Sequence, residues 1–151
     1  MTVVLYGTPQ NRSRFDNKAI ASALENQQDG DTRMPVVLVV EDDWLLRQTM
    51  VDALVAAGWV TREAESAQTA LQILNSGSAI DLLITDLRLG SDTDGWGVAQ
   101  AFRRRNSDLP VIYVSANPVD ESRQLTNSVF LTKPCDMSRL LEVCTTLCPA
   151  N

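Results

Sequence analysis

Short apolar runs alternate with segments of helical periodicity along most of the chain. A run such as Val36–Val40, apolar throughout and rich in β-branched residues, is typical of a strand buried on both faces of a sheet. The pattern predicts five strands: Val36–Val40, Trp59–Ala64, Ile80–Thr85, Val111–Ser115 and Val129–Thr132. Because helices separate them, we predict an α/β fold, a doubly wound five-stranded parallel sheet with helices on both faces.

Each predicted helix begins at a residue that can cap it. After Asp43, apolar residues recur at helical spacing as far as Gly58. The other expected starts are at Ser66, Asp94 and Asp136. Asn117–Pro118 begins one more helix, which can extend only to about Leu125. We therefore predict that the fourth of the helices that cover the sheet, between the strands Val111–Ser115 and Val129–Thr132, is short or irregular.

Residues 1–34 lack this alternation and are rich in polar residues. We predict that they form an N-terminal extension that is largely disordered, with a short helix near Asn17–Glu25. Residues 35–151 are predicted to be one folded domain. A basic start followed by an apolar core is missing from residues 1–34, so no secretory signal is recognised.

Charge and composition exclude several classes of function. The net charge is −6, and all of it lies in residues 35–151, because four basic and four acidic residues balance in residues 1–34. An acidic chain has no electrostatic attraction to nucleic acid or anionic membranes, so we expect neither as a partner. No apolar run reaches the roughly 18–20 residues of a membrane span. The sequence contains no His, the commonest general base and zinc ligand.

The three cysteines are Cys135, Cys144 and Cys148. An odd number grouped near the C-terminus does not make a disulfide framework. Cys144 and Cys148 lie four residues apart in a predicted helix, where core packing is expected. This use of cysteine suits a reducing compartment, so we predict a cytoplasmic protein.

Polar side chains gather where the predicted strands end. In a parallel sheet of this kind, ligands bind at the carboxyl ends of the strands. Carboxylates brought together there repel one another unless a cation intervenes, and Mg²⁺ suits a few oxygen ligands with room for water. An ammonium and a hydroxyl group would complete a phosphoryl site with a carboxylate nucleophile. The residues at these ends are Glu41, Asp42, Asp43, Asp86, Ser115 and Lys133.

The order of these residues resembles the response regulator receiver domain of two-component signalling. The resemblance covers about Pro35 to Cys148. It rests on VLVVEDD (Val37–Asp43), DLLITDLRLG (Asp81–Gly90) followed by Asp94–Gly95, VIYVSA (Val111–Ala116) and FLTKP (Phe130–Pro134). It implies a flavodoxin-like fold of receiver type. Because only one helix fits after Lys133, we expect a stand-alone receiver whose output passes through a partner.

The resemblance also implies a role for each site residue. Asp86 would accept a phosphoryl group, and Asp42 and Asp86 would bind Mg²⁺ together with the backbone carbonyl of Arg88. Glu41 would act on the ion through a water. The remaining roles fall to Lys133, which would contact the phosphoryl oxygens, to Ser115, which would move to bond the phosphate, to Phe130, whose rotamer would follow, and to Ala116, which leaves room for the group.

The sequence departs from the family pattern at three places. Gly90 stands where many members have Pro, and Cys135 replaces the usual aromatic residue after Lys-Pro. The stretch between Ser115 and Lys133 is short, which puts the usual output surface in question. A calcium loop at Asp92–Gly95 is rejected, because Ala101 stands where the loop needs Glu.

The leading hypothesis is a single-domain response regulator. A histidine kinase or a histidine phosphotransfer protein would phosphorylate it, and its affinity for a downstream protein would change; a homodimer is left open. A phosphorelay intermediate, a phosphate sink and a phosphorylation-independent interaction module remain as alternatives. A phosphohydrolase with an external substrate is disfavoured, because such an enzyme needs an acid–base Asp where Arg88 stands. We therefore expect no enzyme beyond self-phosphorylation and self-dephosphorylation.

Overall fold

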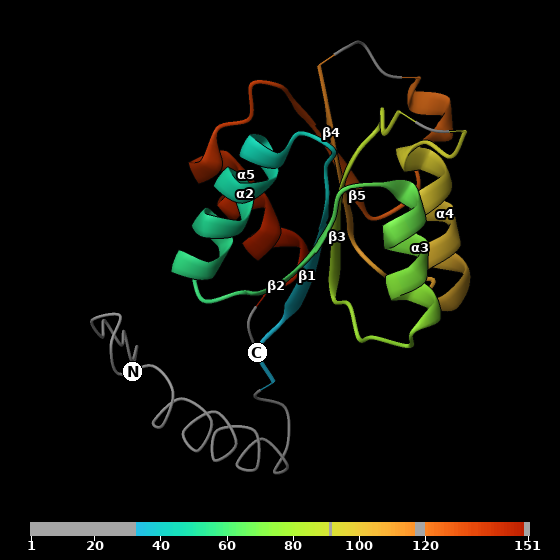
Figure 1. Cartoon of the computed structure of the whole chain (residues 1–151). Coiled ribbons are helices and arrows are strands. Elements are labelled where there is room, and N and C mark those ends of the chain that lie inside the picture. Colours follow the sequence, from blue (N-terminus) through green and yellow to red (C-terminus); the bar gives the residue numbers. More distant parts are fainter. Residues whose placement is uncertain (1–32, 91, 117–119, 150–151) are drawn as a thin grey trace, which may run out of the picture. The chain divides into compact units, whose positions relative to one another are not determined.

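Five parallel strands form one sheet in the part of the chain that the computed structural model describes, residues 33–90, 92–116 and 120–149 (Figure 1). The strands are β1 (Val36–Val40), β2 (Val60–Ala64), β3 (Leu82–Asp86), β4 (Val111–Ser115) and β5 (Ser128–Thr132). Their order is β2-β1-β3-β4-β5, with every neighbouring pair parallel. This is the order of a flavodoxin-like doubly wound sheet, so the predicted fold class is confirmed.

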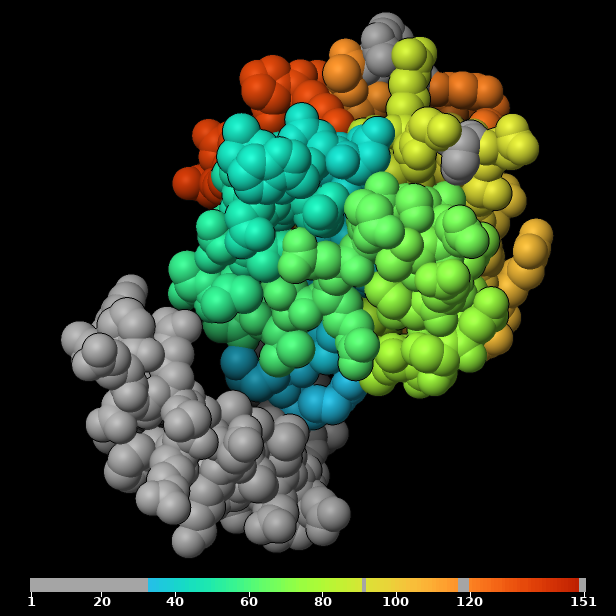
Figure 2. Space-filling model, viewed as in Figure 1, coloured from blue at the N-terminus to red at the C-terminus, as the bar shows by residue number. Residues whose placement is uncertain are grey.

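Helices cover both faces of the sheet. The helices α2 (Trp44–Ala56) and α5 (Met137–Leu147) lie on one face, and α3 (Ala67–Asn75) and α4 (Gly95–Arg105) lie on the other (Figure 1). In the space-filling view, α2, the edge strand β2 and α3 fill much of the side turned to the viewer (Figure 2). The sheet is therefore enclosed between two helical layers.

Alternate residues of the central strands enter two separate apolar layers. Val37 and Val39 of β1 pack with α2 and α5, whereas Leu38 and Val40 pack with α3 and α4. Strands β3 and β4 are buried along their whole length. A strand with a helical layer on each side has no polar face, which is why the sequence shows continuous apolar runs here.

Four of the predicted helix caps lie in the described residues and are confirmed. Each side chain accepts a hydrogen bond from a backbone N–H in the first turn, which satisfies donors that the helix itself leaves unpaired. Asp43 accepts from Leu45 and Leu46 at the start of α2. The other capping residues are Ser66 for α3, Asp94 for α4 and Asp136 for α5.

The third strand ends one residue later than predicted. Its hydrogen-bonded register with β4 continues to the pair Asp86–Val114, so Asp86 is the last residue of β3 rather than the first residue of the loop. At its other end the strand starts two residues later than expected, and β2 and β5 each differ by one residue at their start. The candidate phosphoryl acceptor thus has a main chain held by the sheet.

The connection between β4 and β5 is the segment where a short or irregular helix is predicted, and its described part agrees with that prediction. Between β4 and β5 the described residues form a single 3₁₀ turn, η2 (Glu121–Arg123), capped by Asp120. The expected start at Asn117–Pro118 lies outside the described residues. So does the helix expected near Asn17–Glu25, and the proposed division between residues 34 and 35 stays a prediction. Within the described residues, no helix has the length and apolar character to cross a bilayer.

Arg103, near the end of α4, ties two loops to the helix. Its guanidinium donates to the backbone carbonyl oxygens of Leu109, at 2.5 Å, of Thr126, and of Asn127, at 3.1 Å. Leu109 precedes β4, and the other two precede β5. The guanidinium of Arg103 therefore donates to carbonyl groups of two loops, and its positive charge also interacts favourably with the dipole of α4 at the C-terminal end of that helix.

Replacing Arg103 is expected to loosen this junction. The Arg103→Ala variant should lose about 1–3 kcal/mol of unfolding free energy, because three carbonyl groups lose a charged donor. Urea unfolding measures this. The neighbouring Arg104 is exposed, and its side chain has no ion pair or hydrogen bond within the described residues, so Arg104→Ala serves as the control. Equal losses in the two variants would contradict a specific role for Arg103.

Candidate functional site

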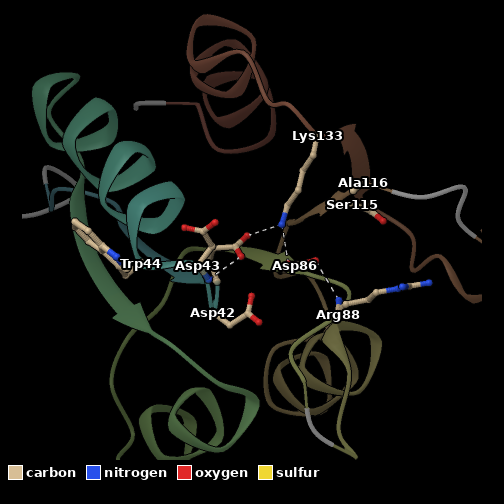
Figure 3. Close-up of a pocket in the computed structure, with 9 residues that line it drawn as sticks. Asp42, Asp43, Trp44, Asp86, Arg88, Ser115, Ala116 and Lys133 are labelled. Carbon is tan, nitrogen blue, oxygen red and sulfur yellow. Dashed lines mark hydrogen bonds and ion pairs between the residues drawn. The ribbon is translucent and has the colours of Figure 1, made fainter.

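The carboxyl ends of β1, β3, β4 and β5 surround an open pocket of about 690 Å³ (Figure 3). The sheet brings together residues that are up to 92 positions apart in the sequence, from Glu41 to Lys133. The lining residues are Glu41, Asp42, Asp43, Trp44, Asp86, Arg88, Ser115, Ala116 and Lys133. Every polar strand-end residue singled out in the sequence therefore lies at one site.

Three carboxylates form an acidic cluster in this pocket. Glu41, Asp42 and Asp86 each offer one oxygen, and these oxygens all lie within 4.8 Å of one another. Glu41 is fully buried and Asp86 is 7% exposed, whereas Asp42 is exposed at the mouth. Hence two carboxylates of the cluster, those of Glu41 and Asp86, are buried, and the third, that of Asp42, is solvated.

Glu41 is the most deeply buried acid of the cluster. Its Oε1 accepts the backbone N–H of Asp43 at 3.1 Å, and its Oε2 lies 3.0 Å from the Lys133 ammonium nitrogen. Burial raises the pKa of Glu41 to about 7; the Lys133 ammonium opposes this rise and the charge of Asp86 adds to it. A proton, a cation or Lys133 must offset its charge.

Asp86 is held through both carboxylate oxygens. Oδ2 accepts a 2.8 Å hydrogen bond from Lys133, and Oδ1 accepts the backbone N–H of Arg88 at 3.1 Å. The loop after β3 therefore orients Asp86 through its main chain. The Arg88 side chain lines the pocket but extends away from Asp86 (Figure 3). The predicted contribution of the Arg88 carbonyl to a metal site stays a prediction.

Lys133 joins the ends of β3 and β5 through its side chain. The ammonium bridges Asp86 and Glu41, and the side chain is 20% exposed. Burial lowers the pKa of Lys133, but the hydrogen bond to Asp86 and the charge of Glu41 outweigh this, so the pKa is raised above its ordinary value. The ammonium charge is therefore secure at neutral pH.

Ser115 and Ala116 form the β4 side of the pocket. Ser115 is the last residue of β4 and is 7% exposed, and its carbonyl oxygen accepts the backbone N–H of Lys133 at 2.9 Å. Ala116 is exposed. The hydroxyl, the small residue and the ammonium thus lie on adjacent strands.

The predicted switch aromatic, Phe130, lies outside the pocket in an aromatic cluster. Its ring centroid is 5.1 Å from that of Tyr113 and 5.5 Å from that of Trp96. Arg123 of η2 lies over the Trp96 ring, 5.3 Å from its centroid, and forms a 3.1 Å ion pair with Asp94. The sequence did not predict the contact between Trp96 and Arg123, because the two residues are 27 positions apart in the chain and no motif indicates that they meet.

Comparison with known proteins identifies the family. The family model for the response regulator receiver domain matches residues 37–145, most of the chain. The chain belongs to this family, as its motifs predict.

Individual relatives agree. The chain is 32% identical over 113 residues to the sensor histidine kinase RcsC of Salmonella typhimurium. The aligned region covers 73% of this chain and 12% of RcsC. It is 32% identical over 111 residues to the response regulator protein FleR of Pseudomonas aeruginosa, covering 71% of this chain and 23% of FleR. The chain therefore spans less than half the length of the curated relatives that it matches.

Solved structures share the fold. A response regulator receiver protein from Sinorhizobium medicae superposes with a TM-score of 0.74 at 29% identity, over 78% of this chain and 97% of that one. A receiver protein from Pseudomonas putida gives a TM-score of 0.66, also at 29% identity, over 76% and 98%. The match thus covers nearly the whole of each solved chain.

The buried charge of Glu41 predicts a pH effect on stability. Its pKa rises from 4.5 to about 7 on folding. Between these values the folded protein keeps a proton that the unfolded chain has lost, so stability falls as pH rises through this window. Glu41→Gln cannot titrate. Without divalent cations, it should therefore gain on the order of 2 kcal/mol relative to wild type between about pH 5 and pH 8.

Urea unfolding of both proteins across this pH range measures the difference. A difference between Glu41→Gln and wild type that does not vary with pH would contradict the raised pKa.

Proposed function

We propose that this chain is a phosphorylation-dependent signalling receiver that accepts a phosphoryl group on Asp86 in the presence of Mg²⁺. The donor is a histidine kinase or a histidine phosphotransfer protein, and phosphorylation changes the affinity for a downstream protein. The observation that carries this proposal is the pairing of Asp86 with Lys133 beside two further carboxylates in an open pocket.

The acidic cluster suits Mg²⁺ by its donor chemistry. Its three ligand groups are carboxylates, and one ammonium offsets only part of their charge. Hard cations with oxygen ligands relieve such crowding. Asp42 and Asp86 would hold the ion, with the carbonyl of Arg88 as a further ligand. The buried Oε2 of Glu41 forms an ion pair with Lys133 at 3.0 Å but accepts no hydrogen bond of regular geometry within the described residues, so it could also accept one from a water of the ion.

The phosphoryl transfer uses groups already in the pocket. A carboxylate oxygen of Asp86 attacks the phosphorus, the O–P bond forms, and the P–N bond to the donor imidazole breaks, with its electron pair going to nitrogen. Bound Mg²⁺ would neutralise charge on the phosphoryl oxygens. Lys133 pairs with one of these oxygens, and the Ser115 hydroxyl can donate to another. Attack by water on phosphorus releases inorganic phosphate and restores the carboxylate.

The change in charge gives a physical basis for switching. Phosphorylation replaces one carboxylate charge with a group of greater charge and more acceptor oxygens. Lys133, which now bridges Asp86 and Glu41, gains a stronger acceptor, and its main chain is bonded to Ser115. A two-state surface near β4 and β5 would respond to this rearrangement.

Other functions are distinguished by the same site. A phosphorelay intermediate or phosphate sink would use the same chemistry without a partner whose affinity depends on phosphate. A phosphorylation-independent module would not need the complete set of acidic groups, Ser115 and Lys133. We propose that the chemistry is limited to the chain's own Asp86, with no external substrate, and that the protein acts in the cytoplasm.

Mg²⁺ is expected to stabilise the protein. At a concentration about 100 times its dissociation constant, the ion should add about 2.7 kcal/mol to the unfolding free energy. Asp42→Ala should abolish this gain, because it removes a ligand at the pocket mouth. Thermal melts with and without Mg²⁺ provide the measurement. The exposed Asp108 precedes β4 at the opposite end of the sheet, so Asp108→Ala should keep the full response. An unchanged response in Asp42→Ala would argue against the cluster as the metal site.

Asp86 is expected to be the phosphorylated residue. Incubation with acetyl phosphate and Mg²⁺ should add the mass of one phosphoryl group, measured on the intact protein. Asp86→Asn should show no such gain, because an amide is not a nucleophile of this kind. Lack of modification in wild type would favour the phosphorylation-independent module, and modification of Asp86→Asn would place the acceptor elsewhere.

A further inference from the structure

The first residue of α4, Gly95, touches the main chain of Asp86. A Cβ atom built on Gly95 would lie 2.0 Å from the carbonyl oxygen of Asp86 and 2.9 Å from its carbonyl carbon. It would also lie 2.9 Å from the Cα of Leu87. These atoms are backbone and cannot swing aside as a flexible side chain could. No residue other than glycine fits between α4 and β3 unless one of them moves.

Close approach, rather than an unusual backbone conformation, makes glycine necessary here. The glycines with positive φ within the described residues are Gly58, Gly77 and Gly90, and Gly95 is not one of them. The sequence singled out Asp94–Gly95 as the start of a helix, which explains Asp94 as the cap but gives no reason for the glycine.

Both sides of this contact are held in place. The N–H of Gly95 donates to the carbonyl of Leu87 at 3.0 Å, and Asp94 caps the helix through Gly97 at 3.0 Å. On the other side, Asp86 is paired with Val114 in the sheet, and its carboxylate is bonded to Lys133. A side chain at position 95 must therefore displace either the helix start or the main chain of Asp86.

We propose that Gly95 is a positioning residue for Asp86. Its missing side chain lets the start of α4 rest on the main chain of the phosphoryl acceptor, and this contact sets the Asp86 carboxylate relative to Lys133 and the acidic cluster. The inference rests on the proposed function, because it assigns Gly95 to the geometry of that reaction. Displacement of Asp86 would change its distance to Lys133, now 2.8 Å, and to the oxygens of Glu41 and Asp42.

The test compares Gly95→Ala with Gly97→Ala. Gly97 lies in the same helical turn, and its added Cβ would meet a side-chain methyl of Thr93 at 3.0 Å and Asp94 Oδ1 at 3.7 Å. For each variant, we would measure the Mg²⁺ dissociation constant and the rate of phosphorylation by acetyl phosphate, well below the melting temperature. Gly95→Ala should weaken Mg²⁺ binding and slow phosphorylation by about tenfold or more, as loss of a group supporting a metal site does. Gly97→Ala should stay near wild type in both.

The outcomes separate this inference from the function on which it rests. If wild type is not phosphorylated, the proposed function fails. If wild type is phosphorylated and Gly95→Ala matches it in both quantities, the positioning role is overturned, even if the variant melts at a lower temperature. If Gly95→Ala does not fold, amide chemical shifts of wild type decide: the Gly95 amide should titrate with Mg²⁺ along the same curve as the Asp86 amide. An unmoved Gly95 amide would overturn the proposal.

Discussion

The ion pairs of Lys133 are the interaction on which the site depends. Glu41 and Asp86 are buried at the ends of neighbouring strands, where water screens the repulsion between their carboxylates only weakly. One ammonium within 3.0 Å of both makes this arrangement tolerable. The raised pKa of Glu41 shows that the offset is incomplete. The negative charge that Lys133 leaves without an offset is what the proposed binding of a further cation would relieve, and any group that competes for Lys133 would change the surroundings of Asp86.

The sheet topology creates this crowding. Parallel strands end at one edge, and the order β2-β1-β3-β4-β5 places β1, β3 and β4 side by side, with β5 next to β4. The end of each strand supplies one part of the site: acids directly after β1 and at the end of β3, a hydroxyl at the end of β4 and an ammonium directly after β5. The backbone bond from Lys133 to Ser115 continues the β4–β5 pairing into the pocket.

Much of this could be predicted from the sequence, and the failures have physical causes. Continuous apolar runs identify buried strands, and capping residues mark the helix starts, because both depend on local pattern. The end of β3 could not be placed, since pairing with Val114 decides it. Arg103 and Arg123 contact groups far along the chain, so their tertiary roles leave no local trace. Gly95 was recognisable in the sequence as part of a motif. The need for glycine at this position comes from the close approach of α4 to the main chain of Asp86, which only the fold creates.

These contacts form a continuous chain from the acceptor to η2. Gly95 rests on Asp86, and the next residue, Trp96, packs against Tyr113 and Phe130. Arg123 then closes over Trp96. A densely packed cluster does not deform continuously, so movement of the Asp86 main chain must be taken up by α4 or by the rings beside it. The described part of the β4–β5 connection contains one 3₁₀ turn, η2, and the ion pair of Arg123 with Asp94 joins that turn to the residue that caps α4. Under the proposed function, the start of α4 would therefore connect a change in charge at Asp86 with the surface near η2.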